Sequence, residues 1–334
     1  MDEKPLFRAR EIFKKIPTRP FHHAPTVVEL PDEDLLAAWY GGSYEGARDV
    51  AILSSRFKLN DNTWTEPSVL IDTPDRSDGN PVLFLDNKGV VWLFYVTMLG
   101  EWWKSCIIKY IKSADGAHSW STPIIMRHKM GWMTRNKPII LGNGDILLPV
   151  YDEERWHSMV MISEDCGKTW RRYGDISTEK GVIQPTVVQL SDQSLLMYMR
   201  TGGLGGYIWE STSTNNGRTW TPASKTHLRN PNSGIEMIRT SSGNLVLAFN
   251  DTSRGRTPLN VALSTDEGIT WPYKKELETG PGEFSYPSLI QTKDGSIHVV
   301  YTHRRGEAGR SGPRLRAYGA NIKHVILNEA WITS

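Results

Sequence analysis

Side chains capable of acid, base or ion-pair chemistry recur in this chain beside the ends of short apolar segments. One set precedes or begins such a segment: His23, Asn80, Lys137, Gln184, Ser233 and Tyr286. A second set follows an apolar segment: Glu45, Asp152, Glu153, Arg200, Asp251, Arg256, Arg304 and Arg305. Arginines can hold a carboxylate by paired hydrogen bonds, and a histidine can accept a proton near neutral pH. This chemistry requires a fold that brings the two sets together.

The apolar segments are predicted to be paired β-strands. Six stretches contain an apolar strand, a turn and a second apolar strand, and they begin at Ala24, Asn80, Lys137, Gln184, Ser233 and Tyr286. They are rich in β-branched residues, and their turns contain Asp, Asn and Gly, which is typical of β-hairpins. The two sets of polar residues therefore flank six hairpins.

An eight-residue motif repeats in register with these hairpins. Its copies are 113–120, 163–170, 213–220 and 264–271, and a degenerate fifth copy covers 55–64. The motif begins with Ser, continues into a turn of Asp, Asn and Gly, and ends on Trp. Such turns tolerate positive φ, and the Trp is predicted to pack the turn onto the sheet. A repeat of about 50 residues is typical of propellers and solenoids.

The two repeats together predict an all-β, six-bladed propeller. Residues 21–334 are expected to form a single propeller domain, with 322–328 as the third strand of the last blade. Residues 1–20 are an N-terminal segment that could close the ring. In a propeller, the innermost strands begin at one rim of the central channel and the second strands return to it. Both polar sets are therefore expected to line one funnel, which would be more polar than packing requires.

Composition narrows the classes of partner. The 334 residues include 39 basic and 37 acidic residues, a net charge of +2, which gives no reason to expect nucleic acid or an anionic membrane surface. Cys106 and Cys166 lack metal-ligand spacing, and neither a metal nor a cofactor is expected. The charged start shows no secretory signal, so the expected location is cytoplasmic, or secreted if a leader was removed. The oligomeric state cannot be read from the sequence.

The motif and the hairpins resemble those of the sialidase (neuraminidase) superfamily over roughly residues 20–328. Members of that superfamily are six-bladed propellers, and the motif is their Asp-box. In that superfamily the boxes indicate the fold but carry no catalytic role, so function depends on the residues of the funnel.

The resemblance implies roles for four residues. Tyr286, in FSYPSL, resembles the family's nucleophile, a tyrosine that is an exception among glycosidases. Arg200 and Arg256 look like two of the three arginines that hold the carboxylate of the sugar. Glu45 stands at the position of the catalytic acid, with Glu in place of the family's Asp.

Two positions depart from the family pattern. His23 stands where the family has its first arginine, and it could orient the substrate or act as a base. Gln184 stands where a Glu normally takes the proton of the tyrosine, which an amide cannot do. Tyr286 would then need another base or a strong cationic field. Glu236 either replaces the missing Glu or faces a neighbouring blade.

The remaining candidates are predicted to bind substrate. The polar ones are Asp78, Asn80, Lys137, Asp152 and Arg304. Four tryptophans outside the boxes could stack on sugar rings: Trp102, Trp103, Trp132 and Trp156.

Three functions are compatible with this sequence. The leading hypothesis is an exo-acting, sialidase-like glycoside hydrolase that releases a terminal, acidic sugar. The second is a lyase that eliminates at a uronic acid, with the arginines neutralising its carboxylate while His23 and Tyr286 handle the protons. The third is a carbohydrate-binding propeller without catalysis. The identity of the sugar and its linkage are not specified by the sequence.

Overall fold

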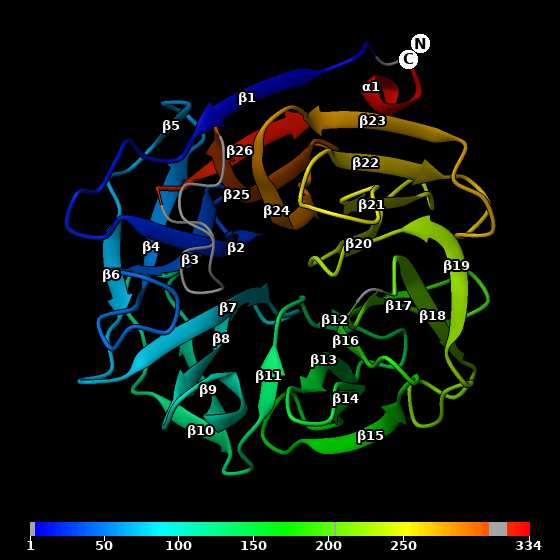
Figure 1. Cartoon of the computed structure of the whole chain (residues 1–334), viewed down its shortest axis with the longest axis horizontal. Coiled ribbons are helices and arrows are strands. Elements are labelled where there is room, and N and C mark those ends of the chain that lie inside the picture. The colour runs from blue at the N-terminus through cyan, green and yellow to red at the C-terminus, as the bar shows by residue number, and fades with distance from the viewer. Residues whose placement is uncertain (1–3, 204, 307–318) are drawn as a thin grey trace.

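Six antiparallel sheets surround a central axis in the computed structural model of the chain, which describes residues 4–203, 205–306 and 319–334 (Figure 1). The fold is the expected all-β propeller with six blades. Its strands are short, and within each blade most neighbouring strands follow one another along the chain, the ring closure being the main exception. This local pairing explains why hairpin signals in the sequence identified the blades.

The first three blades come from the N-terminal half. Blade 1 contains β2 (Phe21–Glu29), β3 (Leu35–Gly42), β4 (Ala51–Lys58), β5 (Thr63–Trp64) and β6 (Ser68–Ile71). Blade 2 contains β7 (Ser77–Leu85), β8 (Val91–Met98), β9 (Cys106–Ser113) and β10 (Ile124–Arg127), with a 3₁₀ turn, η1 (Trp103–Ser105), before β9. Blade 3 contains β11 (Trp132–Thr134), β12 (Ile139–Ile140), β13 (Ile146–Asp152), β14 (His157–Ser163) and β15 (Arg171–Ile176).

The C-terminal half forms the other three. Blade 4 contains β16 (Val182–Gln189), β17 (Leu195–Thr201), β18 (Tyr207–Ser213) and β19 (Ser224–Arg229). Blade 5 contains β20 (Glu236–Arg239), β21 (Leu245–Phe249), β22 (Leu259–Ser264) and β23 (Tyr273–Glu278). Blade 6 contains β24 (Gly282–Gln291), β25 (Ile297–Arg305) and β26 (Asn321–Leu327), and a short helix, α1 (Glu329–Thr333), follows it.

The N-terminal strand completes blade 6. β1 (Phe7–Glu11) pairs antiparallel with β26, with Phe7 opposite Leu327, and so supplies the outermost strand. A second link crosses the same seam, where the Trp64 indole N–H donates to Nδ1 of His324 at 3.2 Å. Blades 1 and 6 are thereby joined although they lie at opposite ends of the chain.

Each Asp-box is held by hydrogen bonds within its own turn. In the copy at 163–170, the Ser163 hydroxyl accepts from the Gly167 N–H at 2.7 Å and donates to the Asp165 carboxylate at 2.8 Å. The hydroxyl and N–H of Thr169 donate to the same carboxylate, and these bonds hold the pKa of Asp165 well below its usual value. The ring of Trp170 packs edge-on against Phe94 of blade 2, with centroids 5.9 Å apart. The box therefore ties its blade to the preceding one.

Apolar side chains fill the spaces between the blades. One cluster joins blades 1 and 2 through residues such as Ile52 and Leu93, and another joins blades 2 and 3 through Phe94 and Leu148. Among the described residues, no helix is both long and apolar enough to span a membrane.

Candidate active site

Four inner strands carry the same irregularity at the rim. Ala24, Asn80, Gln184 and Tyr286 each precede a proline and have φ values of 49°, 45°, 54° and 54°. The strand register shifts at each of these points, as in a β-bulge. Positive φ is strained for residues with side chains, and such strain is concentrated at functional sites. The bulge turns three polar side chains into the funnel and leaves only a methyl group at Ala24.

The funnel contains a cavity of about 670 Å³. It collects polar side chains from both predicted sets and several aromatic rings: His23, Tyr40, Glu45, Asn80, Trp102, Trp103, Tyr151, Glu153, Trp156, Gln184, Arg200, Arg256 and Tyr286. The structure therefore brings together eight residues of the two predicted sets, from all six blades or the loops that follow their strands: His23, Glu45, Asn80, Glu153, Gln184, Arg200, Arg256 and Tyr286.

The Tyr286 hydroxyl lies at the centre of this group. It accepts a hydrogen bond from Nη1 of Arg200 at 2.6 Å and a longer one from the Gln184 side-chain amide at 3.4 Å. The same amide donates to the Tyr151 hydroxyl, also at 3.4 Å. Both partners of Tyr286 are donors, which favours a phenolate oxygen over a phenol.

The charge environment makes Tyr286 more acidic than an ordinary tyrosine. Burial by itself would raise its pKa, but the nearby guanidinium groups of Arg200 and Arg256 and the amide of Gln184 outweigh burial. Glu45 opposes them, and the net result is a lowered pKa. Among the described tyrosines with a shifted pKa, this is the one shifted downward, because burial raises the pKa of Tyr40, Tyr95, Tyr110, Tyr151, Tyr198 and Tyr301.

The two arginines are held differently. Arg200 donates through Nε to Asn232 at 2.6 Å and through Nη1 to Gln184 at 2.9 Å. In the described part of the chain, its Nη2 has no protein hydrogen bond, so that nitrogen can bind a ligand. Arg256 is paired with the buried carboxylate of Glu283 at 2.6 Å, which balances part of its charge. Among the described residues Arg200 has no such ion pair, so its charge is the more available to an anion.

His23 lies against Tyr286 but is a poor base. Its ring centroid is 4.3 Å from that of Tyr286, and its Nδ1 contacts the Thr302 hydroxyl at 3.0 Å. Burial lowers its pKa to about 3, with help from nearby arginines and against the charge of Glu283. An imidazole this weakly basic holds few protons near neutral pH. The expectation that His23 acts as a base near neutrality is therefore not supported, whereas a role in packing and orientation fits its position.

Two glutamates face the cavity. Glu45 lines it from the loop after β3, and its charge acts on Tyr286 and on Glu153. Glu153 lies just after β13, and burial together with Glu45 and Asp152 raises its pKa to about 7 despite the opposing charge of Arg200. Glu153 can therefore exchange a proton near neutral pH, a property that the sequence did not indicate.

Eight predicted polar residues lie outside the cavity lining, and three of them, Ser233, Asp251 and Arg305, were predicted only as part of the rim. Glu236 is paired with Lys137 at 2.8 Å deep in the channel and also accepts from the Leu289 N–H, so it does not replace the missing Glu at Tyr286. Lys137, which was predicted to lie at the rim, is instead the partner of Glu236 in this ion pair. Asp78 accepts hydrogen bonds from Thr73 and Thr97 and stabilises its own loop.

Asp152 and Arg304 are the other two. The Asp152 carboxylate accepts from the N–H groups of Glu154 and Arg155 and pairs with the Arg155 side chain at 3.2 Å, which closes the turn after β13. Arg304 lies opposite Glu283 in the pairing of β24 with β25, away from the cavity lining.

Three of the four tryptophans predicted to stack on sugars line the cavity: Trp102, Trp103 and Trp156. Trp132 instead packs in the core between blades 2 and 3. Trp132 begins a short strand, β11.

No group of three or more His, Cys, Asp or Glu side chains that could hold a metal ion occurs in the described residues. The cavity offers a phenol with a lowered pKa, guanidinium groups and carboxyl groups. Guanidinium groups can hold an anion, and a phenolate can act as a nucleophile.

Comparison with known proteins agrees with this fold. The protein is a divergent sialidase-superfamily propeller, and it belongs to the family described as "BNR repeat-like domain", whose model matches residues 33–299. A sialidase of Micromonospora viridifaciens is 24% identical over 94% of this chain and 52% of its own length. A sialidase of Bacteroides fragilis (strain YCH46) is 23% identical over 67% of this chain and 47% of its own length. The chain spans about half the length of these curated relatives.

Solved structures show the same fold. The NanB sialidase of Streptococcus pneumoniae superposes with a TM-score of 0.80 at 13% identity, over 97% of this chain and 71% of that one. At such identity the likeness establishes the propeller fold and does not identify a substrate.

Proposed function

We propose that this protein is an exo-acting glycoside hydrolase that releases a terminal sugar bearing a carboxylate. The observation that carries the proposal is the Tyr286 hydroxyl, held 2.6 Å from Arg200 within a polar cavity. A phenol with a lowered pKa is a competent nucleophile, and the free Nη2 of Arg200 is placed to bind an anionic substituent.

In the proposed reaction, the Tyr286 oxygen attacks the anomeric carbon while a carboxyl group protonates the departing oxygen. Glu45 is the proposed acid, and Glu153 is a second group that carries a proton near neutral pH. Water then cleaves the bond between tyrosine and sugar, and the same carboxylate removes the proton from the water. The tryptophans of the lining supply faces on which a sugar or the leaving group can stack.

The test is a panel of aryl glycosides of sialic acid, other ulosonic acids, uronic acids and neutral sugars. Release of reducing sugar from an acidic member supports hydrolysis. An unsaturated product that absorbs in the ultraviolet would instead indicate a lyase, for which the weakly basic His23 is a poor proton acceptor. Turnover confined to neutral sugars would contradict the proposed carboxylate clamp.

Gln184 favours a second candidate, a carbohydrate-binding propeller without catalysis. Its amide occupies the place beside Tyr286 where a proton acceptor would be expected. Calorimetric binding of an acidic sugar with no product after prolonged incubation would support this function and contradict the hydrolase.

A further inference from the structure

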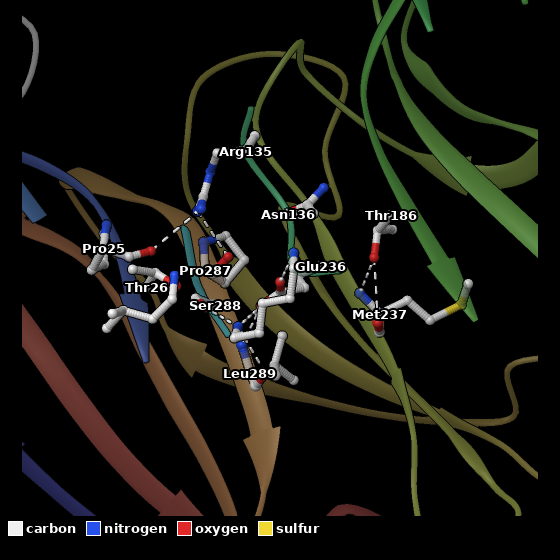
Figure 2. A network of polar contacts seen from close by, with 12 residues as sticks. Pro25, Thr26, Arg135, Asn136, Thr186, Glu236, Met237, Pro287, Ser288 and Leu289 are labelled. Carbon is white, nitrogen blue, oxygen red and sulfur yellow. Dashed lines mark hydrogen bonds and ion pairs between the residues drawn. The ribbon is translucent and has the colours of Figure 1, made fainter. Parts of the chain in front are cut away.

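Residues 135–137 interrupt the inner edge of blade 3 and form hydrogen bonds with blades 1, 4, 5 and 6. They lie between β11 and β12, and Figure 2 shows Arg135 reaching toward the carbonyl groups of Pro25 and Pro287. Its Nη2 donates to the carbonyl oxygens of Tyr286 and Pro287 at 2.8 and 3.0 Å. We call residues 135–137 the axial segment. Through Arg135 it links blade 3 to blades 1 and 6, directly at the main chain of Tyr286.

The charge of Arg135 has no carboxylate partner among the described residues. Arg135 is 2% exposed, and the acceptors of its side chain among those residues are all main-chain carbonyl oxygens. Lys137, two residues on, is by contrast neutralised by Glu236. A buried cation without an ion pair is costly, so a purely structural clamp would be served as well by a neutral donor. The charge of Arg135 is therefore expected to do more than hold the main chain in place.

That charge lies close to the Tyr286 ring. The guanidinium carbon of Arg135 is 5.2 Å from the ring centroid, comparable with 5.0 Å for Arg256 and 5.7 Å for Arg200. Burial lowers the pKa of Arg135, and the negative charges of Glu236 and of an ionised Tyr286 oppose this, so Arg135 and the phenolate stabilise each other. The titratable and charged groups facing Tyr286 are His23, Tyr40, Glu45, Arg135, Tyr151, Arg200 and Arg256.

We propose that Arg135 is a positioning residue for Tyr286. Arg135 anchors the strained main chain of Tyr286, and its charge, which has no ion-pair partner among the described residues, stabilises the Tyr286 phenolate. This stabilisation replaces the carboxylate base that Tyr286 lacks. The phenolic proton passes to water in the cavity, and the phenolate is left between guanidinium groups. The catalytic meaning of this inference rests on the proposed function, although the effect on ionisation does not.

The experiment is a titration of the phenolate absorbance in the full-length protein, with Tyr286→Phe subtracted to isolate one phenol. Arg135→Gln is expected to raise the pKa of Tyr286 by about 1–2, the effect of one charge at this distance in a medium of intermediate polarity. The pH at which turnover reaches half its maximum should rise by the same amount. An unchanged phenolic pKa in folded Arg135→Gln would overturn the proposal.

Two further variants separate charge from structure. Replacement of Arg135 by citrulline keeps an NH₂ group for the Tyr286 and Pro287 carbonyls but removes the charge. If Arg135→Gln does not fold, the citrulline variant shows whether the charge lowers the pKa of Tyr286. It should raise the phenolic pKa like Arg135→Gln, and a wild-type value would overturn the proposal.

Asn136→Ala is the matched control within the axial segment. Asn136 donates to the carbonyls of Gln184 and Pro185, both at 3.0 Å, and carries no charge. Its loss should leave the pKa of Tyr286 unchanged, and a rise as large as that from Arg135→Gln would assign the effect to loosened structure. Titration needs no substrate, so a wild-type protein that titrates as expected but cleaves no glycoside would contradict only the proposed function.

Discussion

At the scale of single residues, the site depends on side chains presented by strained main chain. Tyr286 and Gln184 both have positive φ before a proline, and both reach the cavity. The contacts of Arg135 with the carbonyls of Tyr286 and Pro287 hold one of these bulges in place. Strain at these positions is tolerated because hydrogen bonds from other blades determine the conformation.

Glu153 gives a prediction at this scale. Its pKa of about 7 means that it is mostly neutral at pH 6 and mostly charged at pH 8. A charged Glu153 repels the carboxylate of an acidic sugar, so KM should rise by up to roughly tenfold as pH increases through 7. Glu153→Gln should remove that rise.

Steady-state kinetics against pH provide the measurement. The control is a neutral glycoside of the same aglycone, for which wild type and Glu153→Gln should have the same pH dependence of KM. A rise in KM with pH that persists in Glu153→Gln would show that another group is responsible.

At the scale of elements, the Asp-boxes bind each blade to its predecessor. Gly167 has a φ of 79°, and a Cβ atom there would overlap the ring of Trp92 in blade 2. Gly217 and Gly268 approach Leu147 and Leu196 of their preceding blades in the same way. Glycine therefore allows close contact between blades at this position in three copies of the box, whereas the copy at 113–120 has Ala117 there, with a φ of 66°.

Gly167→Ala is expected to lower the free energy of unfolding by about 2–4 kcal/mol, since it combines positive φ with a clash in a packed interface. Gly144→Ala is the matched control, because Gly144 has a φ of 88° but open space around it. Its cost should be about 1 kcal/mol, from conformation alone. Denaturant unfolding measures both, and equal losses would contradict the role of box packing.

At the scale of the whole molecule, the ring closes through segments from both ends of the chain. β1 pairs with β26, and Trp64 of blade 1 donates to the buried ring of His324 in blade 6. His324 in turn contacts His298 at 2.9 Å. The closure therefore contains neutral imidazoles that cannot take up protons without losing these contacts.

Acid should destabilise the fold for this reason. Burial lowers the pKa of His22 and His298 to about 4 and of His23 to about 3. Below pH 6.5 these histidines bind protons in the unfolded state but stay neutral in the native state. The free energy of unfolding therefore decreases as the pH falls from 6.5 toward the pKa that each histidine has in the native state. Each of the three should contribute roughly 1–2 kcal/mol of loss between pH 7 and pH 5.

Urea unfolding at a series of pH values tests this expectation. His298→Gln should reduce the slope of unfolding free energy against pH by about one proton in this range. A slope unaffected by the substitution would mean that His298 is not the group that titrates.

The sequence predicted local features well because the relevant pairing is local. Hairpins from Ala24 to Tyr286 identified the blades, and the convergence of Tyr286, Arg200, Arg256 and Glu45 followed from the symmetry of a propeller. Contacts across the axis were missed. Arg135 bonds with Tyr286, 151 positions away, and the pairing of Lys137 with Glu236 spans 99.

The sequence contains only weak indications of the functional residues that were not predicted from it. Arg135 lies just before Lys137-Pro138, the blade-3 counterpart of the other residue-proline pairs, and Glu283 lies three residues before Tyr286. The pairing of Glu283 with Arg256 depends on how the loop after β21 folds back, which hydrophobic periodicity does not specify. The pKa of Glu153 likewise depends on burial and on neighbours from other blades.

The central claim, that Tyr286 attacks the anomeric carbon, is tested most directly by trapping the covalent intermediate. A fluorinated, activated derivative of the sugar identified in the panel would be mixed with enzyme, quenched in acid and digested with trypsin. The peptide 276–293 contains Tyr286 as its single tyrosine. We predict a mass increase of one glycosyl group on this peptide, located at Tyr286 and absent from Tyr286→Phe. Turnover of the parent glycoside with no such adduct, or with the sugar on another residue, would contradict the account.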